Sequence, residues 1–105
     1  MATLVNDQNF QEEVLNSSTP VMIDFFADWC GPCRALLPVV EELATEYAGT
    51  VKIVKVNVDE SPETAQNFGV MSIPTLIFVK GGQEVDRAVG ALPKDALSAK
   101  LDALK

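Results

Sequence analysis

The sequence contains no histidine and only two cysteines. A structural zinc site needs about four nitrogen or sulfur ligands, so two thiols without an imidazole exclude a closed zinc site within one chain. A metal shared between two chains is left as a minor alternative. Two cysteines also cannot build the disulfide scaffold on which many small secreted proteins depend. The fold must therefore rest on an apolar core.

Basic residues are scarce, since 8 Lys and Arg stand against 15 Asp and Glu and the net charge is −7. A protein that binds nucleic acid needs a basic stripe to displace counterions, and an anionic membrane surface attracts the same charge. We therefore expect neither nucleic acid nor a membrane as a partner. The acidic residues are attributed to a solvated surface.

Long hydrophobic runs are also missing, because Asp24 and Pro38 interrupt the best candidates for a stretch of about 18 apolar residues. The first basic residue is Arg34, so the start of the chain lacks the positive charge of a secretory signal or a mitochondrial presequence. We expect a soluble, cytoplasmic protein. Its 105 residues, 48% of them hydrophobic, are predicted to form one domain, residues 1–105.

Apolar periodicity and turn residues predict the element order β-α-β-α-β-α-β-β-α. Strands are expected at residues 3–5, 21–27, 51–58, 75–80 and 85–89. Helices are expected from a cap at Asn6 or Asp7 to about Asn16, from the Cys30 region to Gly49 with a kink at Pro38, from Pro62 (capped by Ser61) to Gly69, and from Pro93 onward. This order predicts an α/β fold with a mixed sheet, helices on both faces and one antiparallel hairpin.

Cys30 and Cys33 frame Gly31 and Pro32 where a buried strand gives way to a helix. Residues three apart lie on one helical face, so the two sulfurs can close a small disulfide ring. At the helix start Cys30 would meet unpaired backbone N–H groups and the positive end of the dipole, which stabilise the nucleophilic thiolate. Cys33, one turn deeper, is expected to be shielded and to keep its proton. Pro32 is tolerated in the first turn and stiffens the ring.

A Cys-x-x-Cys pair also has uses other than redox chemistry. Haem attachment requires His directly after the second Cys, and Arg34 stands there. Two idle buried thiols are the remaining alternative. The position between a buried strand and a helix favours a redox pair.

Other residues join this pair in an order and spacing that resembles the thioredoxin family. They are Ile23-Asp24-Phe25, Trp29-Cys30-Gly31-Pro32-Cys33, Pro38, Lys55, Asp59, Ile73-Pro74-Thr75 and Gly90. The resemblance covers essentially the whole chain, and the Trp-Cys-Gly-Pro-Cys sequence is highly specific. It implies the thioredoxin fold, with a central mixed five-stranded sheet flanked by four helices. It also implies a general protein-disulfide reductase with the redox disulfide Cys30–Cys33.

The resemblance implies no bound cofactor, because the dithiol itself carries both electrons. These would come from NADPH through a flavin-dependent thioredoxin reductase and pass to disulfide-containing protein substrates. We expect a monomer. One alternative is an interaction or holdase module that acts without turnover. Another is an oxidase or isomerase, but those relatives tend to carry His before the second Cys, where this chain has Pro32.

Asp24 is the one charge in an apolar strand, and a buried carboxylate is costly unless it is protonated or paired. Lys55 is a cation on the face that Val51 and Ile53 share in another strand. In the catalytic interpretation Asp24 moves a proton to or from Cys33, with its pKa raised towards neutrality by burial and tuned by Lys55. In the structural alternative Asp24 is a paired core acid and Lys55 reaches solvent.

The resemblance further implies a substrate surface around the sulfurs. The Ile73–Pro74 bond is expected to be cis and packed against the disulfide, with the Ile73 backbone free to pair with an extended substrate. An apolar rim would be completed by Trp29, Gly31, Pro32, Gly90 and Ala91. For Trp29 the alternative is an ordinary core position.

Three residues depart from the family's pattern. Phe26 stands where many members carry a second Trp, so an indole N–H near Asp24 is missing. Arg34 replaces a frequent Lys and keeps the charge. Ser72 occupies a place often held by Gly, which changes how closely partners approach.

Overall fold

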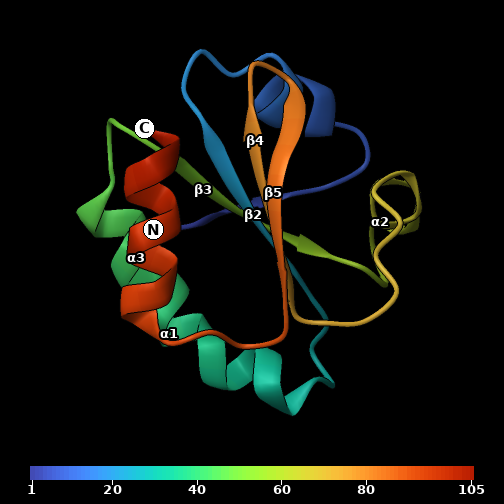
Figure 1. The fold of residues 1–105 in the computed structure, drawn as a ribbon. Coiled ribbons are helices and arrows are strands. Elements are labelled where there is room, and N and C mark those ends of the chain that lie inside the picture. Colours follow the sequence, from blue (N-terminus) through green and yellow to red (C-terminus); the bar gives the residue numbers. More distant parts are fainter.

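The computed structural model describes residues 1–105, and its centre is a five-stranded sheet with the strand order β1-β3-β2-β4-β5 (Figure 1). The strands are β1 (Thr3–Val5), β2 (Val21–Phe26), β3 (Lys52–Asn57), β4 (Thr75–Lys80) and β5 (Gln83–Val89). β1, β3 and β2 run parallel, whereas β4 runs antiparallel to β2 and β5 antiparallel to β4. The predicted mixed sheet with one hairpin is confirmed.

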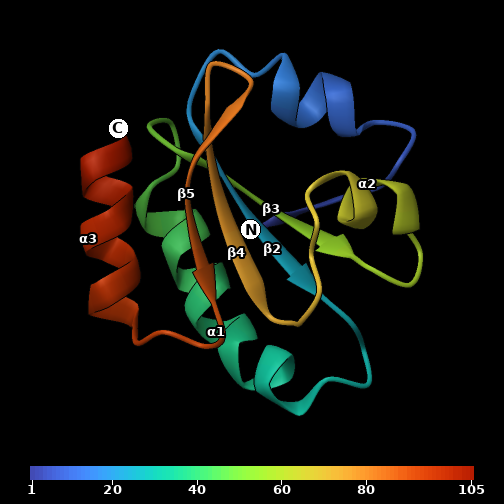
Figure 2. The same ribbon diagram turned by 45° about the vertical axis from the view of Figure 1, so that its right-hand side comes forward.

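Helical segments cover both faces of this sheet. They are η1 (a π-helix, Gln11–Leu15), α1 (Gly31–Glu46), α2 (Pro62–Asn67) and α3 (Lys94–Leu104). Figure 2 shows α1 and α3 on one face and η1 and α2 on the other. None of these helices has the length and apolar character needed to cross a bilayer.

The central strand β2 is buried on both of its faces, as its nearly continuous apolar sequence predicts. Met22 belongs to the core cluster beneath α1 and α3. Ile23 and Phe25 point to the opposite side and belong to the cluster beneath η1 and α2. Because side chains alternate along a strand, Asp24 lies on the same face as Met22, under α1.

The first helical segment is shorter than predicted. The Asn6 side chain accepts hydrogen bonds from the backbone N–H groups of Gln8 and Asn9, which closes a turn before η1 begins. Asp7 does not cap this segment: its carboxylate accepts from the N–H and the hydroxyl of Thr64 at the start of α2. The residue expected there, Ser61, occupies the cap position but makes no side-chain cap bond.

α1 continues through Pro38, as expected for a helix that the proline bends but does not end. Proline lacks the N–H for an intrahelical bond, and its ring clashes with the carbonyl four residues back. Figures 1 and 2 show that the helix changes direction partway along its length. The bend lets the first turn present the cysteine pair while the later turns pack on the sheet.

The two-sided burial of β2 predicts a large stability loss when a central side chain is truncated. Phe25 is fully buried and its ring packs against Phe68. We expect Phe25→Ala to lower the free energy of unfolding by about 3–5 kcal/mol in urea titrations. The control Val89→Ala, at a position 62% exposed, should change it by less than about 0.5 kcal/mol. A similar loss in both variants would contradict the assigned core.

Candidate active site

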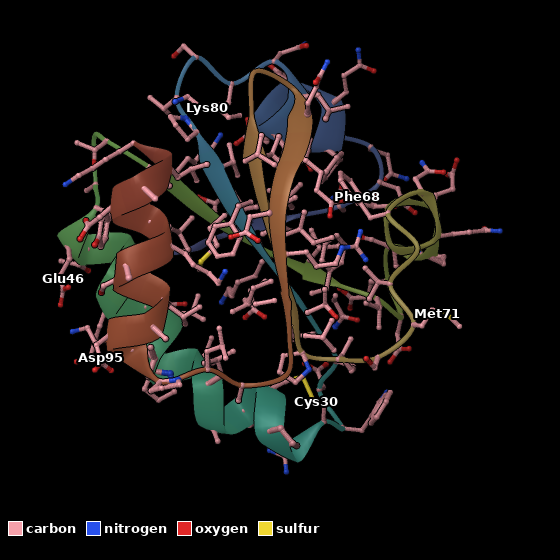
Figure 3. All side chains as sticks on the ribbon, in the orientation of Figure 1. Cys30, Glu46, Phe68, Met71, Lys80 and Asp95 are labelled. Carbon is pink, nitrogen blue, oxygen red and sulfur yellow. A yellow bond between two sulfur atoms is a disulfide. The ribbon has the colours of Figure 1, made fainter.

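The cysteine pair lies at the carboxyl end of β2. The strand ends at Phe26, a short loop follows, and Cys30 is the residue that caps the start of α1. Cys30 and Cys33 form a disulfide with their Cα atoms 5.2 Å apart. Figure 3 shows the yellow disulfide next to the Cys30 label, at the end of the sheet opposite Lys80. The predicted i, i+3 ring is therefore present.

The backbone at the start of α1 points its donors at the outer sulfur. Cys30 has an extended conformation, and the N–H of Cys33 donates to Cys30 Sγ at 3.2 Å. A first-turn N–H has no partner within the helix, so this sulfur takes the place that a Ser or Asp oxygen usually fills. Together with the positive end of the helix dipole, the contact favours a negative charge on Cys30 Sγ when the ring is open.

Both cysteines are largely covered in the disulfide form. Cys30 is 5% exposed and Cys33 is 3% exposed, so the expected contrast between an open outer sulfur and a shielded inner one is small here. Phe26, Val58 and Ile73 pack against the pair. Each sulfur also shields the other in the closed ring. The expected contrast in exposure concerned the reduced pair, in which this mutual shielding is absent.

The loop before β4 closes over the disulfide. The Ile73–Pro74 peptide bond is cis, as the resemblance implies. The Ile73 carbonyl oxygen lies 3.9 Å from Cys30 Sγ. The Pro74 carbonyl accepts a hydrogen bond from the N–H of Gly90 at 2.8 Å, and Gly90 has a φ of 93°, which favours glycine. Gly90 therefore secures the loop that faces the outer sulfur.

Trp29 faces solvent rather than the core. The residue is 69% exposed, and its Nε1 donates to Asp59 Oδ2 at 2.8 Å. Gly31, Pro32 and Ala91 are exposed as well, whereas Gly90 is half-buried. The alternative of a core position for Trp29 is wrong, because the side chain is exposed, with its indole N–H bound to Asp59, directly before Cys30 in the chain.

Two exposed apolar residues near this surface were not predicted. Leu37 lines a pocket of about 270 Å³ together with Phe26 and Cys33. Met71 is 97% exposed in the loop that leads to Ile73 and Pro74. The sequence offered one indication for each residue: Leu37 is an apolar side chain on the polar side of a helix, and Met71 is an apolar side chain in a loop.

Asp24 is the most deeply buried charged residue. It is 1% exposed, and its Oδ1 has no hydrogen-bond partner. Burial raises the pKa of Asp24 to about 7, against the opposing attraction of Lys55, while the charge of Glu41 adds to the rise. Asp24 precedes Phe26 on the same face of β2, and Phe26 lines the pocket that contains Cys33.

Lys55 does not close an ion pair with Asp24. The two residues are direct neighbours in the β2–β3 register, but Lys55 Nζ lies 3.2 Å from Glu41 Oε2 on α1. The structural alternative of a paired core acid is therefore not met, because Asp24 stays unpaired. Glu41 was not predicted. The feature of the sequence that could have indicated it is the position of Glu41 directly after Val40, at the border of the buried face of α1.

The whole chain matches a known family. The Thioredoxin family model matches residues 1–103. This chain belongs to the thioredoxin family. It is 54% identical over 101 residues to thioredoxin 1 of Nostoc sp., covering 96% of this chain and 94% of that protein. It is 56% identical over 96 residues to thioredoxin 2 of Chlorobaculum tepidum, covering 91% and 88%.

A plant relative belongs to the same group. The chain is 52% identical over 99 residues to the chloroplastic M-type thioredoxin of Pisum sativum, covering 94% of this chain and 58% of that protein. Family membership and the Cys30–Cys33 disulfide together establish the activity: the chain is a dithiol–disulfide oxidoreductase that reduces protein disulfides. Thioredoxins perform this exchange without a resident cofactor.

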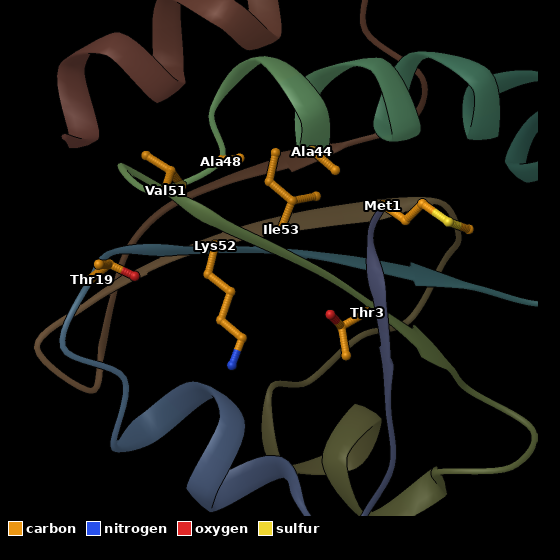
Figure 4. A pocket seen from close by; sticks show the side chains of 9 residues that line it. Met1, Thr3, Thr19, Ala44, Ala48, Val51, Lys52 and Ile53 are labelled. Carbon is orange, nitrogen blue, oxygen red and sulfur yellow. The ribbon is translucent and has the colours of Figure 1, made fainter.

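The opposite end of the sheet holds a pocket of about 280 Å³ between the start of β1, the residues before β2 and the end of α1 (Figure 4). The ammonium of Lys52 beside it is bound to the carbonyl and carboxylate oxygens of Glu13. No group of three or more His, Cys, Asp or Glu side chains is arranged to hold a metal ion.

The unpaired burial of Asp24 predicts a pH-dependent stability. The acid holds its proton up to about pH 7 in the folded state but loses it near its ordinary pKa of 3.8 when unfolded. The folded state therefore loses stability as pH rises from about 4 to about 7. At about 1.4 kcal/mol per pH unit, the full effect is on the order of 4 kcal/mol.

Asp24→Asn removes this titration. We expect the variant's stability, relative to the natural chain, to increase between pH 4 and pH 8.5 in denaturant titrations with the disulfide intact. Comparing the two pH values cancels the fixed cost of burying an amide. A relative stability that stays constant over this range would contradict the raised pKa of Asp24.

Proposed function

We propose that Cys30 is the nucleophile and Cys33 the resolving thiol of a general protein-disulfide reductase. The Cys30 thiolate attacks one sulfur of a substrate disulfide, forms a mixed disulfide and releases the other substrate sulfur as a thiolate. Cys33 then loses its proton and attacks Cys30 Sγ. This breaks the mixed disulfide, releases the second substrate sulfur and leaves Cys30–Cys33 oxidised, so two electrons pass to the substrate.

The observation that carries this assignment is the hydrogen bond from the Cys33 N–H to Cys30 Sγ at the start of α1. It gives Cys30 a donor that favours its thiolate, whereas Cys33 lies three residues further along, inside the first turn of α1, where the residue is 3% exposed. The unequal surroundings of two chemically identical groups support their different roles.

Asp24 is proposed to accept the proton of Cys33 in the resolving step. A carboxyl with a pKa of about 7 is divided between its two forms near neutral pH, which suits a group that takes up and returns a proton. Lys55 tunes this acidity through its charge from β3. Support comes from the burial of Asp24 and from its place on the face of β2 that leads to the Cys33 pocket.

The substrate is proposed to lie across the disulfide as an extended segment. The Ile73 backbone would pair with its main chain, and such pairing tolerates many side chains. Trp29, Gly31 and Pro32 on one side and Gly90 and Ala91 on the other would contact the flanking residues. This arrangement is supported by the exposed indole and by the contact of the Ile73 carbonyl with Cys30 Sγ.

The oxidised protein is proposed to be recharged by a flavin-containing thioredoxin reductase that draws electrons from NADPH. We propose that the chain works in the cytoplasm. It is expected to act as a monomer, because both redox sulfurs come from one chain and the exchange needs no second copy.

Serine variants separate the two sulfur roles. We expect Cys30→Ser to reduce insulin disulfides no faster than a protein-free control. A serine hydroxyl is hardly ionised at neutral pH, so it cannot replace the thiolate as the nucleophile. Cys33→Ser should instead accumulate a covalent mixed disulfide, visible by mass spectrometry and released by dithiothreitol. An active Cys30→Ser variant would refute the assignment. So would the formation of mixed disulfides through Cys33 in that variant at the rate seen for Cys30.

A further inference from the structure

Asp24 has charged neighbours on two of the elements that surround it. Lys55 faces it from β3, and Glu41 acts on it from α1. On the other side, β4 offers the apolar Leu76 as its register partner. Lys55 is the one cation among these neighbours, so the stabilisation of a negative charge on Asp24 depends on where the Lys55 ammonium lies.

That ammonium is held on α1. Lys55 Nζ and Glu41 Oε2 are 3.2 Å apart, and the two side chains are only 20% and 28% exposed. Partial burial makes such a pair stronger than one on the open surface, because less solvent screens it. The pair thus opposes any movement of Lys55 towards the unpaired Oδ1 of Asp24.

Glu41 is itself fixed at a second point. Its Oε1 accepts the backbone N–H of Ala2 at 2.8 Å, just before β1 begins. β1 pairs with β3 so that Leu4 is the register partner of Lys55. The two carboxylate oxygens therefore tie α1 to adjacent strands, and these contacts hold the pKa of Glu41 below its usual range. Glu41 stays charged and oriented across the pH range of the reaction.

We propose that Glu41 is a positioning residue that keeps the Lys55 ammonium on α1 and so prevents it from closing an ion pair with Asp24. Its effect on disulfide reduction rests on the proposed role of Asp24 as the proton acceptor for Cys33. Without Glu41, Lys55 is free to pair with Asp24, the carboxylate is stabilised and its pKa falls. A carboxylate held by an ammonium accepts a proton from Cys33 less readily.

The test is a side-chain carboxyl NMR titration of Asp24 in the full oxidised chain. In Glu41→Gln, where the amide oxygen can still accept the Ala2 N–H, we expect the pKa of Asp24 to fall by about one pH unit. The matched control is Glu46→Gln, which makes the same charge change on α1 but at a residue paired with Lys94. There the pKa of Asp24 should stay within about 0.2 of its natural value.

A double variant separates ion-pair closure from the loss of Glu41 charge. Lys55→Met removes the ammonium and should raise the pKa of Asp24 in either background, but the rise should be larger in Glu41→Gln, where the ion pair has closed, than in the natural chain. An unchanged Asp24 pKa in Glu41→Gln overturns the proposal. Equal falls in Glu41→Gln and Glu46→Gln, or an equal rise on adding Lys55→Met to Glu41→Gln and to the natural chain, overturn it as well.

The resolving step provides a second readout. In Glu41→Gln the pH profile of mixed-disulfide resolution by Cys33, followed by stopped flow, should move to lower pH together with the pKa of Asp24. If the pKa falls while the profile stays in place, Glu41 still positions Lys55 but Asp24 is not the proton acceptor. The failure of the proposed function is in this way distinguishable from the failure of the inference.

Discussion

The hydrogen bond between the Cys33 N–H and Cys30 Sγ is the contact on which the proposed roles of the two cysteines depend. It exists because a helix leaves its first N–H groups without partners and because Cys30, in an extended conformation, caps that end. The contact is present with the neutral sulfur of the disulfide, and it becomes stronger when the sulfur carries negative charge. This asymmetry at the helix start supports the proposal that Cys30 is the better nucleophile of the two cysteines.

The rest of the fold places groups around that helix start. The buried strand β2 ends one loop before Cys30, and its burial on both faces gives α1 a rigid base. The cis bond before Pro74 brings the Ile73 carbonyl to the outer sulfur, and Gly90 secures that loop through Pro74. The same strand carries Asp24 under α1, where desolvation keeps its pKa near neutrality. The cysteine pair and the Ile73 carbonyl thus lie at one end of the sheet, and Asp24 lies two residues before that end of β2.

Short-range sequence patterns predicted the features that depend on residues close together in the chain. β4 lies at residues 75–80 as expected, because Pro74 and the two glycines after Lys80 bound an apolar run. The cap position of Cys30 also followed from short-range rules. Contacts between residues far apart in the sequence did not follow from these rules. Asp7 forms a hydrogen bond with Thr64, 57 residues away, and the Lys55 ammonium pairs with Glu41 rather than with Asp24. A side chain with several partners in reach is decided by packing, which spacing along the chain does not encode.

The central claim is that the two sulfurs of the reduced protein differ in ionisation and access. Alkylation of the freshly reduced chain with iodoacetamide, quenched over time and located by peptide mass spectrometry between pH 5 and pH 9, measures both. The account predicts that Cys30 is modified first at neutral pH and faster than free cysteine, while Cys33 reacts slowly. Modification of Cys33 first, or of both residues at the rate of free cysteine, would contradict it.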